Sequence, residues 1–323
     1  MSSKNLKSVT VPNTVILAGS NSRKLANSIG YTNNLPVLQH KIVHFVNSEM
    51  KITIPFQLTK DTKVWIVQST SNPANDNFME LMLLVDTLRI SKITDINVII
   101  PYFGYSRQDK QHLAGECMSM KMITNILKTL GVKTIITCDI HNALATKNLG
   151  IDISDQSTLP VLAKQIYKDL NLNIESEKEF IIGSPDQGGI FRCDVFAKNF
   201  YQNHKNSNTV SVKKERELSK IHYSRAVELY GDIDKPNLIL IDDVSTSGST
   251  IINAIELCKS NNVKNVYVVI VHADFAKGVL EKFENNDLLK RVYTTNTIEK
   301  PVEDMDWYNI VKVIDVAECI KLD

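Results

Sequence analysis

The sequence has few of the features that are typical of secreted proteins, membrane-spanning proteins or proteins with a structural metal site. It contains five cysteines at widely spaced positions and no Cys-x-x-Cys pair. This number and spacing argue against a disulfide framework and a structural zinc site, and they are typical of thiols in a reducing compartment. No apolar stretch approaches the roughly 18 residues of a membrane span, and the opening MSSKNLKSVTVPN carries no secretory signal. We therefore expect a soluble, cytoplasmic protein without a membrane partner.

An excess of either charge is also missing. The chain has 37 Lys and Arg residues against 36 Asp and Glu, a formal net charge of +1. Nucleic-acid-binding domains usually carry a basic excess, so we expect no nucleic-acid partner. The 323 residues are 43% hydrophobic, 23% charged and 7% aromatic, which excludes wholesale disorder. This length predicts about two domains of roughly 150 residues each.

Short apolar runs rich in valine and isoleucine recur along the chain and predict buried strands. They are Thr14–Ala18, Val64–Val67, Val98–Ile100, Thr134–Thr137, Phe180–Ile182, Leu238–Ile241 and Val266–Val271. Segments with helical periodicity separate many of these runs, and the clearest are Asn77–Ile90 and about Ser249 to Ser260.

Continuous apolar strands that alternate with helices predict parallel sheets covered on both faces. We therefore predict an α/β fold with two tandem domains, each a mostly parallel sheet flanked by helices. The domains are expected at residues 1–154 and 155–323, with the joint within Gly150–Leu159.

The most informative stretch is NLILIDDVSTSGSTIINAIELC, in which a buried strand ends in Asp242 and Asp243. Ser245–Thr250 then supplies hydroxyls and one glycine before a helix begins. A helix N-terminus attracts phosphate through its unpaired N–H groups, and two carboxylates accept hydrogen bonds from a vicinal diol or hold magnesium indirectly. A phosphate and a diol a few Å apart describe a pentose 5-phosphate. The alternative is a structural Asp-Asp turn with hydroxyl side chains capping the helix.

This stretch resembles the ribose-phosphate signature of the phosphoribosyltransferase fold. The resemblance implies a ribose-5-phosphate site made by Asp242, Asp243, Thr246, Ser247, Gly248, Ser249 and Thr250. The fold serves both phosphoribosyltransferases and the enzyme that makes their common substrate, so this motif does not choose between them.

Further segments, in order along nearly the whole chain, resemble the ribose-phosphate diphosphokinase (phosphoribosyl diphosphate synthetase) family, with some archaeal-type features. They are HFVNSE, VWIVQSTSNPANDNFMELMLLVDTLR, VIIPYFGYSRQDK, CDIHN, GSPDQGGIFR and TTNTI. The resemblance implies transfer of the diphosphoryl group of ATP to the 1-hydroxyl of ribose 5-phosphate. The products are phosphoribosyl diphosphate and AMP, and the implied cofactor is magnesium.

The resemblance also implies an ATP site in the N-terminal half. An arginine plane stacks on adenine while its charge meets phosphate oxygens. Arg107 and Phe45 would sandwich the adenine, in a homo-oligomer whose adenine site lies near a subunit interface. Its other implied residues are Asn47, Glu49, Gln108 and Asp109. The alternative for Phe45 is plain core packing.

Two metal ligands and two catalytic cations complete the implied site. His141 would bind magnesium near the ATP phosphates, and Asp186 would contact the ribose phosphate directly or through a second magnesium. The alternatives are a satisfied polar histidine and a helix cap. Lys214 and Arg216 match a Lys-x-Arg pair on a mobile loop that closes over the transferring phosphates, and Arg216 would also bind ribose 5-phosphate. The alternative is a solvated run of charges.

The chain departs from the family pattern at several positions. Thr246 replaces a third acid of the signature, as in archaeal-type members, and Asn47 replaces the commoner aspartate of the adenine-site run. The segment GECMSMK resembles an archaeal-type loop, and the chain lacks a longer family tail. Donor preference, phosphate activation and inhibition by nucleoside diphosphates stay open. Two other functions also stay open: a phosphoribosyltransferase, and a non-catalytic regulatory subunit of a synthetase.

Overall fold

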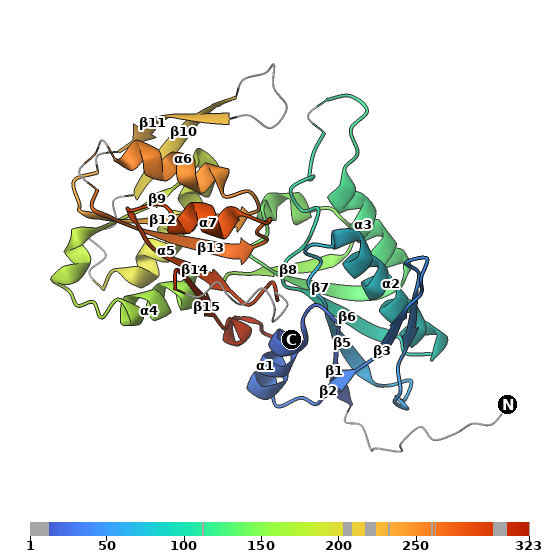
Figure 1. The fold of residues 1–323 in the computed structure, drawn as a ribbon. Helices are drawn as coiled ribbons and strands as arrows, with labels where there is room; N and C mark the ends of the chain where they lie inside the picture. The colour runs from blue at the N-terminus through green and yellow to red at the C-terminus, as the bar shows by residue number, and fades with distance from the viewer. Residues whose placement is uncertain are drawn as a thin grey trace. The chain divides into compact units, whose positions relative to one another are not determined.

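The computed structural model describes residues 13–111, 113–202, 209–216, 224–231, 233–259, 261, 263–299 and 309–322 (Figure 1). The chain divides into two compact units. The first takes the described residues of Met1–Gln156, Thr297–Glu299 and Asp315–Asp323, and the second takes those of Ser157–Asn296 and Lys300–Ile314. The division after Gln156 falls two residues beyond the expected boundary.

The first unit is built on a six-stranded parallel sheet with the order β2-β1-β5-β6-β7-β8. Its strands are β1 (Thr14–Ala18), β2 (Val37–Gln39), β5 (Lys63–Val67), β6 (Asp95–Ile100), β7 (Val132–Cys138) and β8 (Asp152–Gln156). Its helices are α1 (Arg23–Asn33), α2 (Ala74–Ile90) and α3 (Ser119–Thr129), with the 3-10 turns η1 (Ala143–Thr146) and η6 (Ala317–Cys319). A separate antiparallel hairpin consists of β3 (Lys41–His44) and β4 (Met50–Thr53).

Alternation along the strands explains why their sequences are apolar throughout. Val15 and Leu17 of β1 pack into a core with α2 and α3, whereas Ile16 and Ala18 of the same strand pack into a second core with α1. Both faces of the sheet are therefore buried, as parallel sheets require. The predicted helix at Asn77–Ile90 is present and begins three residues earlier, at Ala74.

The second unit holds a seven-stranded sheet with the order β11-β10-β9-β12-β13-β14-β15. All its strand pairs are parallel except β10 with β11. The strands are β9 (Phe180–Ser184), β10 (Thr209–Arg216), β11 (Ser224–Tyr230), β12 (Asn237–Ser245), β13 (Asn265–Ala273), β14 (Leu289–Thr295) and β15 (Val311–Ile314). The helices are α4 (Leu159–Asp169), α5 (Ile190–Phe200), α6 (Ser249–Cys258) and α7 (Val279–Glu284), with the 3-10 turns η2 (Ser176–Glu179) and η3 (Gln187–Gly189).

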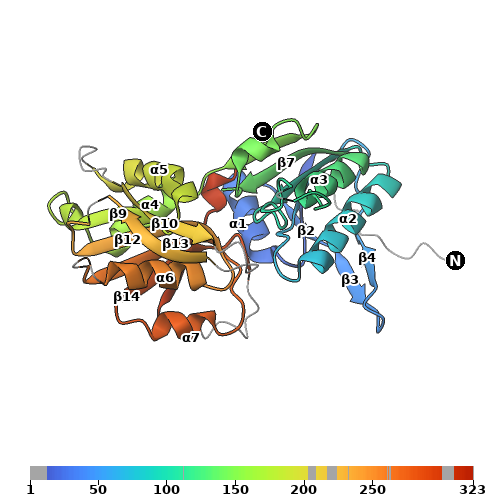
Figure 2. The same ribbon diagram turned by 90° about the horizontal axis from the view of Figure 1, so that it is seen from above.

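In this unit α4 and α5 cover one face of the sheet, and α6 and α7 cover the other (Figure 2). β12 contributes side chains to both cores. Leu238 and Leu240 face α6 and α7, whereas Ile239 and Ile241 face α4 and α5. The mostly parallel α/β architecture that the sequence predicts is thus confirmed.

Two features of the predicted organisation are wrong. The strand expected at Leu238–Ile241 does not end before the acidic pair, because pairing with β13 carries β12 through Asp242 and Asp243 to Ser245. The chain is also not a simple tandem, since Asp315–Asp323 belongs to the first unit. The apolar side chains of Ala317 and Ile320 join the core around α1, and this burial draws the end of the chain back.

All five cysteines are free, and Cys138, Cys193 and Cys258 are buried. In the part of the chain that the structure describes, no helix combines the length and the apolar character needed to cross a bilayer.

A buried acid anchors the first unit where β1 and β5 end. Glu80 of α2 is 2% exposed. Its carboxylate accepts hydrogen bonds from the N–H of Ser20 at 2.7 Å and from Nε2 of Gln68 at 3.1 Å, and it also binds the Ser20 hydroxyl. Nε2 of His40 lies 3.1 Å from Oε1 of the same carboxylate. Burial by itself raises the pKa of Glu80, but His40 and Ser20 outweigh burial and lower the pKa.

Because this pKa is lower in the folded protein, ionised Glu80 stabilises the fold above its unfolded pKa, and the contribution is lost as the pH falls through the folded pKa. We expect Glu80→Gln to cost about 2 kcal/mol of unfolding free energy at pH 7 and to reduce the loss of stability on acidification. Denaturant unfolding between pH 7 and pH 3 measures both. Asp86→Asn, which removes an exposed acid from the same helix, is the control. Equal acid sensitivity of Glu80→Gln and the wild type would contradict the assignment.

Candidate functional site

The loop that follows β6 approaches the loop that follows β5 very closely. The N–H of Gly104 donates to the Thr70 hydroxyl at 2.8 Å, and that hydroxyl donates to the carbonyl of Tyr102 at 3.1 Å. A Cβ at position 104 would lie 2.2 Å from the carbonyl oxygen of Thr70. Only glycine permits this approach, which fixes the start of the segment that leads to Arg107.

Tyr105 then turns the chain outward. Its backbone has φ +65°, a left-handed conformation that is strained for a bulky residue. The ring packs 5.9 Å from that of Phe78 on α2, and the hydroxyl donates to Oδ1 of Asn75 on the same helix. These contacts hold the strained turn, and two residues later Arg107 is exposed to solvent.

The next two residues connect this loop to its neighbours. Oε1 of Gln108 accepts a hydrogen bond from the Ser119 hydroxyl at the start of α3. Oδ2 of Asp109 accepts one from Nδ2 of Asn142 at 2.6 Å. Asn142 directly follows His141, which is exposed beyond the end of β7. The structure therefore brings Arg107, Gln108 and Asp109 together with the His141 loop at the carboxyl edge of one sheet, where ligands bind in open α/β folds.

The hydrogen bond between Asp109 and Asn142 can be tested by exchanging the two side chains. Asn142→Asp keeps the oxygen that caps η1 by accepting from the N–H of Leu144, but it faces one carboxylate with another. We expect this variant to lose about 1–2 kcal/mol of unfolding free energy, measured by denaturant unfolding. The double variant Asp109→Asn with Asn142→Asp restores a donor opposite an acceptor and is expected to recover most of the loss. A double variant no more stable than Asn142→Asp would disprove the coupling.

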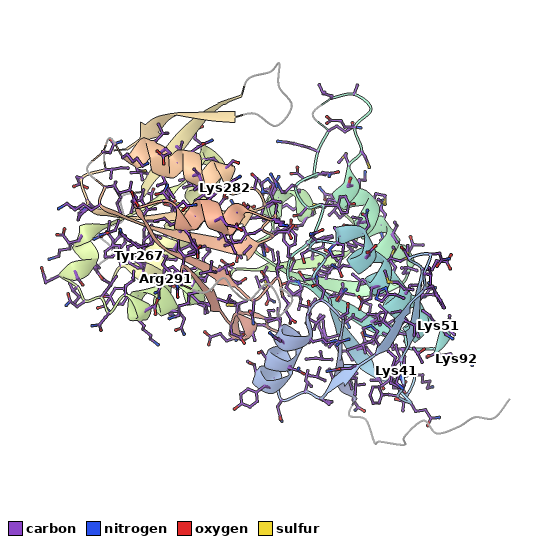
Figure 3. All side chains as sticks on the ribbon, in the orientation of Figure 1. Lys41, Lys51, Lys92, Tyr267, Lys282 and Arg291 are labelled. Atoms are coloured by element: carbon purple, nitrogen blue, oxygen red, sulfur yellow. The ribbon has the colours of Figure 1, made fainter. Side chains whose placement is uncertain are left out.

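The hairpin of β3 and β4 carries the expected adenine residues at its tip. Phe45 is 48% exposed, so core packing, the alternative for this residue, is wrong. Its N–H donates to the carbonyl of Glu49 at 2.8 Å, and Oδ1 of Asn47 accepts from the N–H of Glu49 at 3.2 Å. In Figure 3, Lys41 and Lys51 mark the two strands. Among residues 13–111, no hydrogen bond, ion pair or ring contact joins this tip to Arg107.

In the second unit, β9 and β12 are paired, so their carboxyl ends meet at one edge of the sheet. Asp186 follows β9 and is half-buried. As the residue before η3 it makes no side-chain cap hydrogen bond, which counts against the helix-cap alternative. A Cβ on Gly189 would lie 2.0 Å from Oγ of Ser184, so the second glycine of this segment permits the entry of α5 close to β9.

The acidic pair lies near the carboxyl end of β12, beside this segment. Asp242 and Asp243 are 9% and 4% exposed. Oδ2 of Asp243 lies 2.9 Å from Nη2 of Arg192 on α5. Oδ1 of Asp242 accepts the N–H of Asp243 at 3.0 Å. Two buried carboxylates and one partly buried guanidinium therefore lie at the edge where β9 and β12 end.

The turn after β12 exposes hydroxyls in front of a helix. Thr246, Ser247 and Ser249 are exposed, and the N–H of Ser249 donates weakly to the Ser247 hydroxyl at 3.4 Å. Gly248 precedes the first residue of α6 with φ +70°, and having no side chain it leaves the first N–H groups of α6 uncapped by its own residue. This arrangement of N–H groups and hydroxyls suits a phosphate.

The expected catalytic cations lie on a strand. Lys214 and Arg216 belong to β10, paired with Ala226 and Ser224 of β11, and the register shifts between Lys213 and Lys214. Antiparallel pairing with β11 keeps the backbone extended at both positions, and the mobility expected of this segment stays a prediction.

Asn142 and Arg192 have no predicted role, although they lie within the motifs CDIHN and GSPDQGGIFR. Asn142 follows His141 at the end of a strand, where polar residues gather in α/β proteins. Arg192 comes three residues after a Gly-Gly pair that opens a helix. A polar residue at a fixed offset from a strand end or a helix start was the available signal in both cases.

The chain is similar to known proteins along most of its length. A family model described as the N-terminal domain of ribose phosphate pyrophosphokinase matches residues 14–131, and one described as the phosphoribosyl synthetase-associated domain matches residues 198–321. The ribose-phosphate pyrophosphokinase of Mycoplasmopsis pulmonis is 30% identical over 305 residues, covering 94% of this chain and 90% of that protein. The one of Fusobacterium nucleatum is 30% identical over 289 residues, covering 90% and 87%.

A solved structure shares the whole architecture. The phosphoribosylpyrophosphate synthetase from Mycobacterium smegmatis superposes with a TM-score of 0.81 at 21% sequence identity, and the match covers 95% of each chain. At this level of identity the likeness concerns the fold: both units and their order along the chain are shared.

Proposed function

The chain belongs to the ribose-phosphate pyrophosphokinase family, and on this premise we propose that it transfers the diphosphoryl group of ATP to the 1-hydroxyl of ribose 5-phosphate. The products are phosphoribosyl diphosphate and AMP. The observation that carries the proposal is the pair Asp242 and Asp243 at the end of β12, followed by the hydroxyl turn that opens α6. A diol and a phosphate on one small sugar match these two features.

In the second unit, the substrate is ribose 5-phosphate. The exposed hydroxyls of the turn and the first N–H groups of α6 hold its 5-phosphate, and the acidic pair accepts hydrogen bonds from its ring hydroxyls. The proposed residues are Asp242, Asp243, Thr246, Ser247, Gly248, Ser249, Thr250 and Arg216. Thr246, in place of an acid, adds a neutral hydroxyl to this set and leaves the negative charge to the pair on β12.

In the first unit, the substrate is ATP. Exposed Arg107 stacks on the adenine and meets the phosphates, and Gln108 and Asp109 add polar contacts, from a loop fixed by its bonds to Ser119 and Asn142. Phe45, Asn47 and Glu49, exposed at the hairpin tip, supply the other side of the adenine site from a neighbouring subunit. This arrangement makes the protein a homo-oligomer.

The side chains of this chain fit a magnesium ion that is bound mainly by the phosphates of the substrate. Among the described residues, no group of three or more His, Cys, Asp and Glu side chains is arranged to hold a metal. Magnesium usually takes one or two protein ligands and completes its shell with water and substrate phosphates. His141 would bind one magnesium near the ATP phosphates, and Asp186 would contact the ribose phosphate directly or through a second magnesium. When present, the ion supplies positive charge against the phosphate oxygens.

The reaction needs an oriented acceptor and a cationic surrounding rather than a covalent intermediate. The 1-hydroxyl oxygen of the sugar forms a bond to the β-phosphorus of ATP, and the bond from that phosphorus to the α,β-bridging oxygen breaks. AMP leaves with that oxygen, and the hydroxyl proton passes to solvent. Charge develops on the phosphate oxygens, where Lys214, Arg216 and Arg107 stabilise it.

The segment Gly115–Ser119 carries the archaeal-type feature of this proposal. Gly115, Glu116 and Cys117 are exposed, and Oε2 of Glu116 accepts the N–H of Leu113 at 3.0 Å. This hydrogen bond closes the loop on itself. The sequence that follows Arg107 has no arginine-rich run that could bind a regulatory phosphate. We expect activity without added inorganic phosphate, measured by comparing rates with and without it.

The test of the function is AMP release. The full chain is incubated with ATP, magnesium and ribose 5-phosphate, and AMP and phosphoribosyl diphosphate are followed by chromatography. AMP formed in equal amount with phosphoribosyl diphosphate, and only when ribose 5-phosphate is present, is the expected result. A phosphoribosyltransferase would instead consume phosphoribosyl diphosphate together with a base. A regulatory subunit would be silent alone and would co-purify with an active synthetase.

A further inference from the structure

A buried ion pair connects helix α5 to the acidic pair of β12. Nη2 of Arg192 lies 2.9 Å from Oδ2 of Asp243, and the side chains are only 14% and 6% exposed. A hydrogen bond between two charged groups is stronger than a neutral one, and removal of one partner leaves the other charge buried. The orientation of Asp243 therefore depends on Arg192.

The two acids that the sequence treats alike are not equivalent in the structure. Neighbouring side chains of a strand point to opposite faces of the sheet. Asp243 follows the face of Ile239 and Ile241, which pack against α4 and α5, and it meets Arg192 there. Asp242 follows the face of the leucines that pack against α6 and α7. Asp243 therefore meets Arg192 on the face covered by α4 and α5, and Asp242 lies on the opposite face.

Arg192 lies in acidic surroundings, and its positive charge offsets part of theirs. Asp186, Asp242 and Asp243 gather where anionic substrates are to bind. The pKa of the Cys193 thiol, directly after Arg192, is raised to about 12, chiefly by burial; Asp194, Asp242 and Asp186 raise it further and Arg192 opposes them. The charges of the acids and of the guanidinium therefore both act on the pKa of this thiol. A site with several carboxylates repels a sugar phosphate unless a positive group offsets part of their charge.

We propose that Arg192 is a positioning residue of the ribose-5-phosphate site, which fixes Asp243 in the orientation that accepts a hydrogen bond from a ring hydroxyl of the sugar. The inference rests on the proposed function and adds to it one residue, Arg192. Arg192 acts through Asp243 and does not itself contact the sugar phosphate.

A double-mutant cycle on ribose-5-phosphate binding tests this role. The dissociation constant is measured by titration calorimetry on the full-length wild type, Arg192→Leu, Asp243→Asn and the double variant. We expect Arg192→Leu to weaken binding roughly 10- to 100-fold, and the double variant to bind no more weakly than Asp243→Asn alone. In turnover, the KM for ribose 5-phosphate is expected to rise while the KM for ATP stays within about twofold.

Two further variants keep the test decisive. Arg192→Lys retains the charge and is expected to recover part of the binding, and it serves where Arg192→Leu does not fold. Lys198→Ala removes an exposed cation from the same helix and is expected to bind like the wild type. Thermal unfolding of each variant monitors folding.

Three results would overturn the inference. If Arg192→Leu and Asp243→Asn have additive effects, Arg192 acts on the sugar phosphate itself. If Arg192→Leu binds ribose 5-phosphate normally, it has no positioning role. If the folded wild type does not bind ribose 5-phosphate, the proposed function fails first and the inference fails with it.

Discussion

Lys214→Ala is expected to lower kcat about 10²–10³-fold, the usual effect of removing one preorganised group that stabilises transition-state charge. On the proposed role, Lys214 interacts with the phosphates only as charge develops on them. The loss is therefore expected to fall on kcat far more than on either KM. Initial rates of AMP formation, with each substrate varied in turn, measure the split.

Lys213→Ala is the matched control for this experiment. It removes the same charge from the adjacent position of β10, on the other side of the register shift. We expect its kcat to stay within about twofold of the wild type. Near-normal turnover in Lys214→Ala would remove Lys214 from the mechanism, and equal losses in both variants would indicate a general effect of strand charge.

Gly248→Ala is expected to destabilise the second unit and to weaken binding of ribose 5-phosphate. The residue has φ +70°, and an added Cβ would lie 2.9 Å from Cγ1 of Val279 and 3.2 Å from Cε1 of Phe283. The left-handed conformation costs a non-glycine residue about 1–2 kcal/mol, and overpacking a buried site adds about 1–3 kcal/mol. Denaturant unfolding measures the first effect and titration calorimetry the second.

Gly278→Ala separates the two costs. Gly278 precedes α7 with φ +86°, and an added Cβ there would meet nothing within 4 Å. This variant carries the conformational cost without the clash, so we expect it to lose about 1–2 kcal/mol and to bind ribose 5-phosphate normally. If both variants are equally destabilised, the clash with Val279 and Phe283 contributes nothing.

The fold could be predicted where apolar pattern and burial coincide. β1 occupies Thr14–Ala18 as expected, because all its side chains except the first are buried on one face or the other. The hairpin of β3 and β4 was missed because its exposed residues carry no such pattern. The extension of β12 through Asp242 and Asp243 was also missed. The apolar pattern of the sequence stops before these acids, but pairing with β13 keeps them in the strand.

The candidate site was predictable as residue types but not as contacts. The acids, the hydroxyl turn and the Arg107 segment are all readable as short motifs. The bond from Asp109 to Asn142 joins residues 33 positions apart, and the one from Arg192 to Asp243 joins residues 51 apart. Such pairs depend on which strands become neighbours, and a single sequence does not give strand order.

The return of the last residues to the first unit has a consequence for synthesis on the ribosome. Ile320 covers the core around α1, which also includes Leu25 and Cys138. The ribosome adds about 5–20 residues per second, so on the order of ten seconds separates completion of β8 from the emergence of Ile320. During this interval the nascent N-terminal unit presents an uncovered apolar surface, a natural target for chaperones that bind emerging chains.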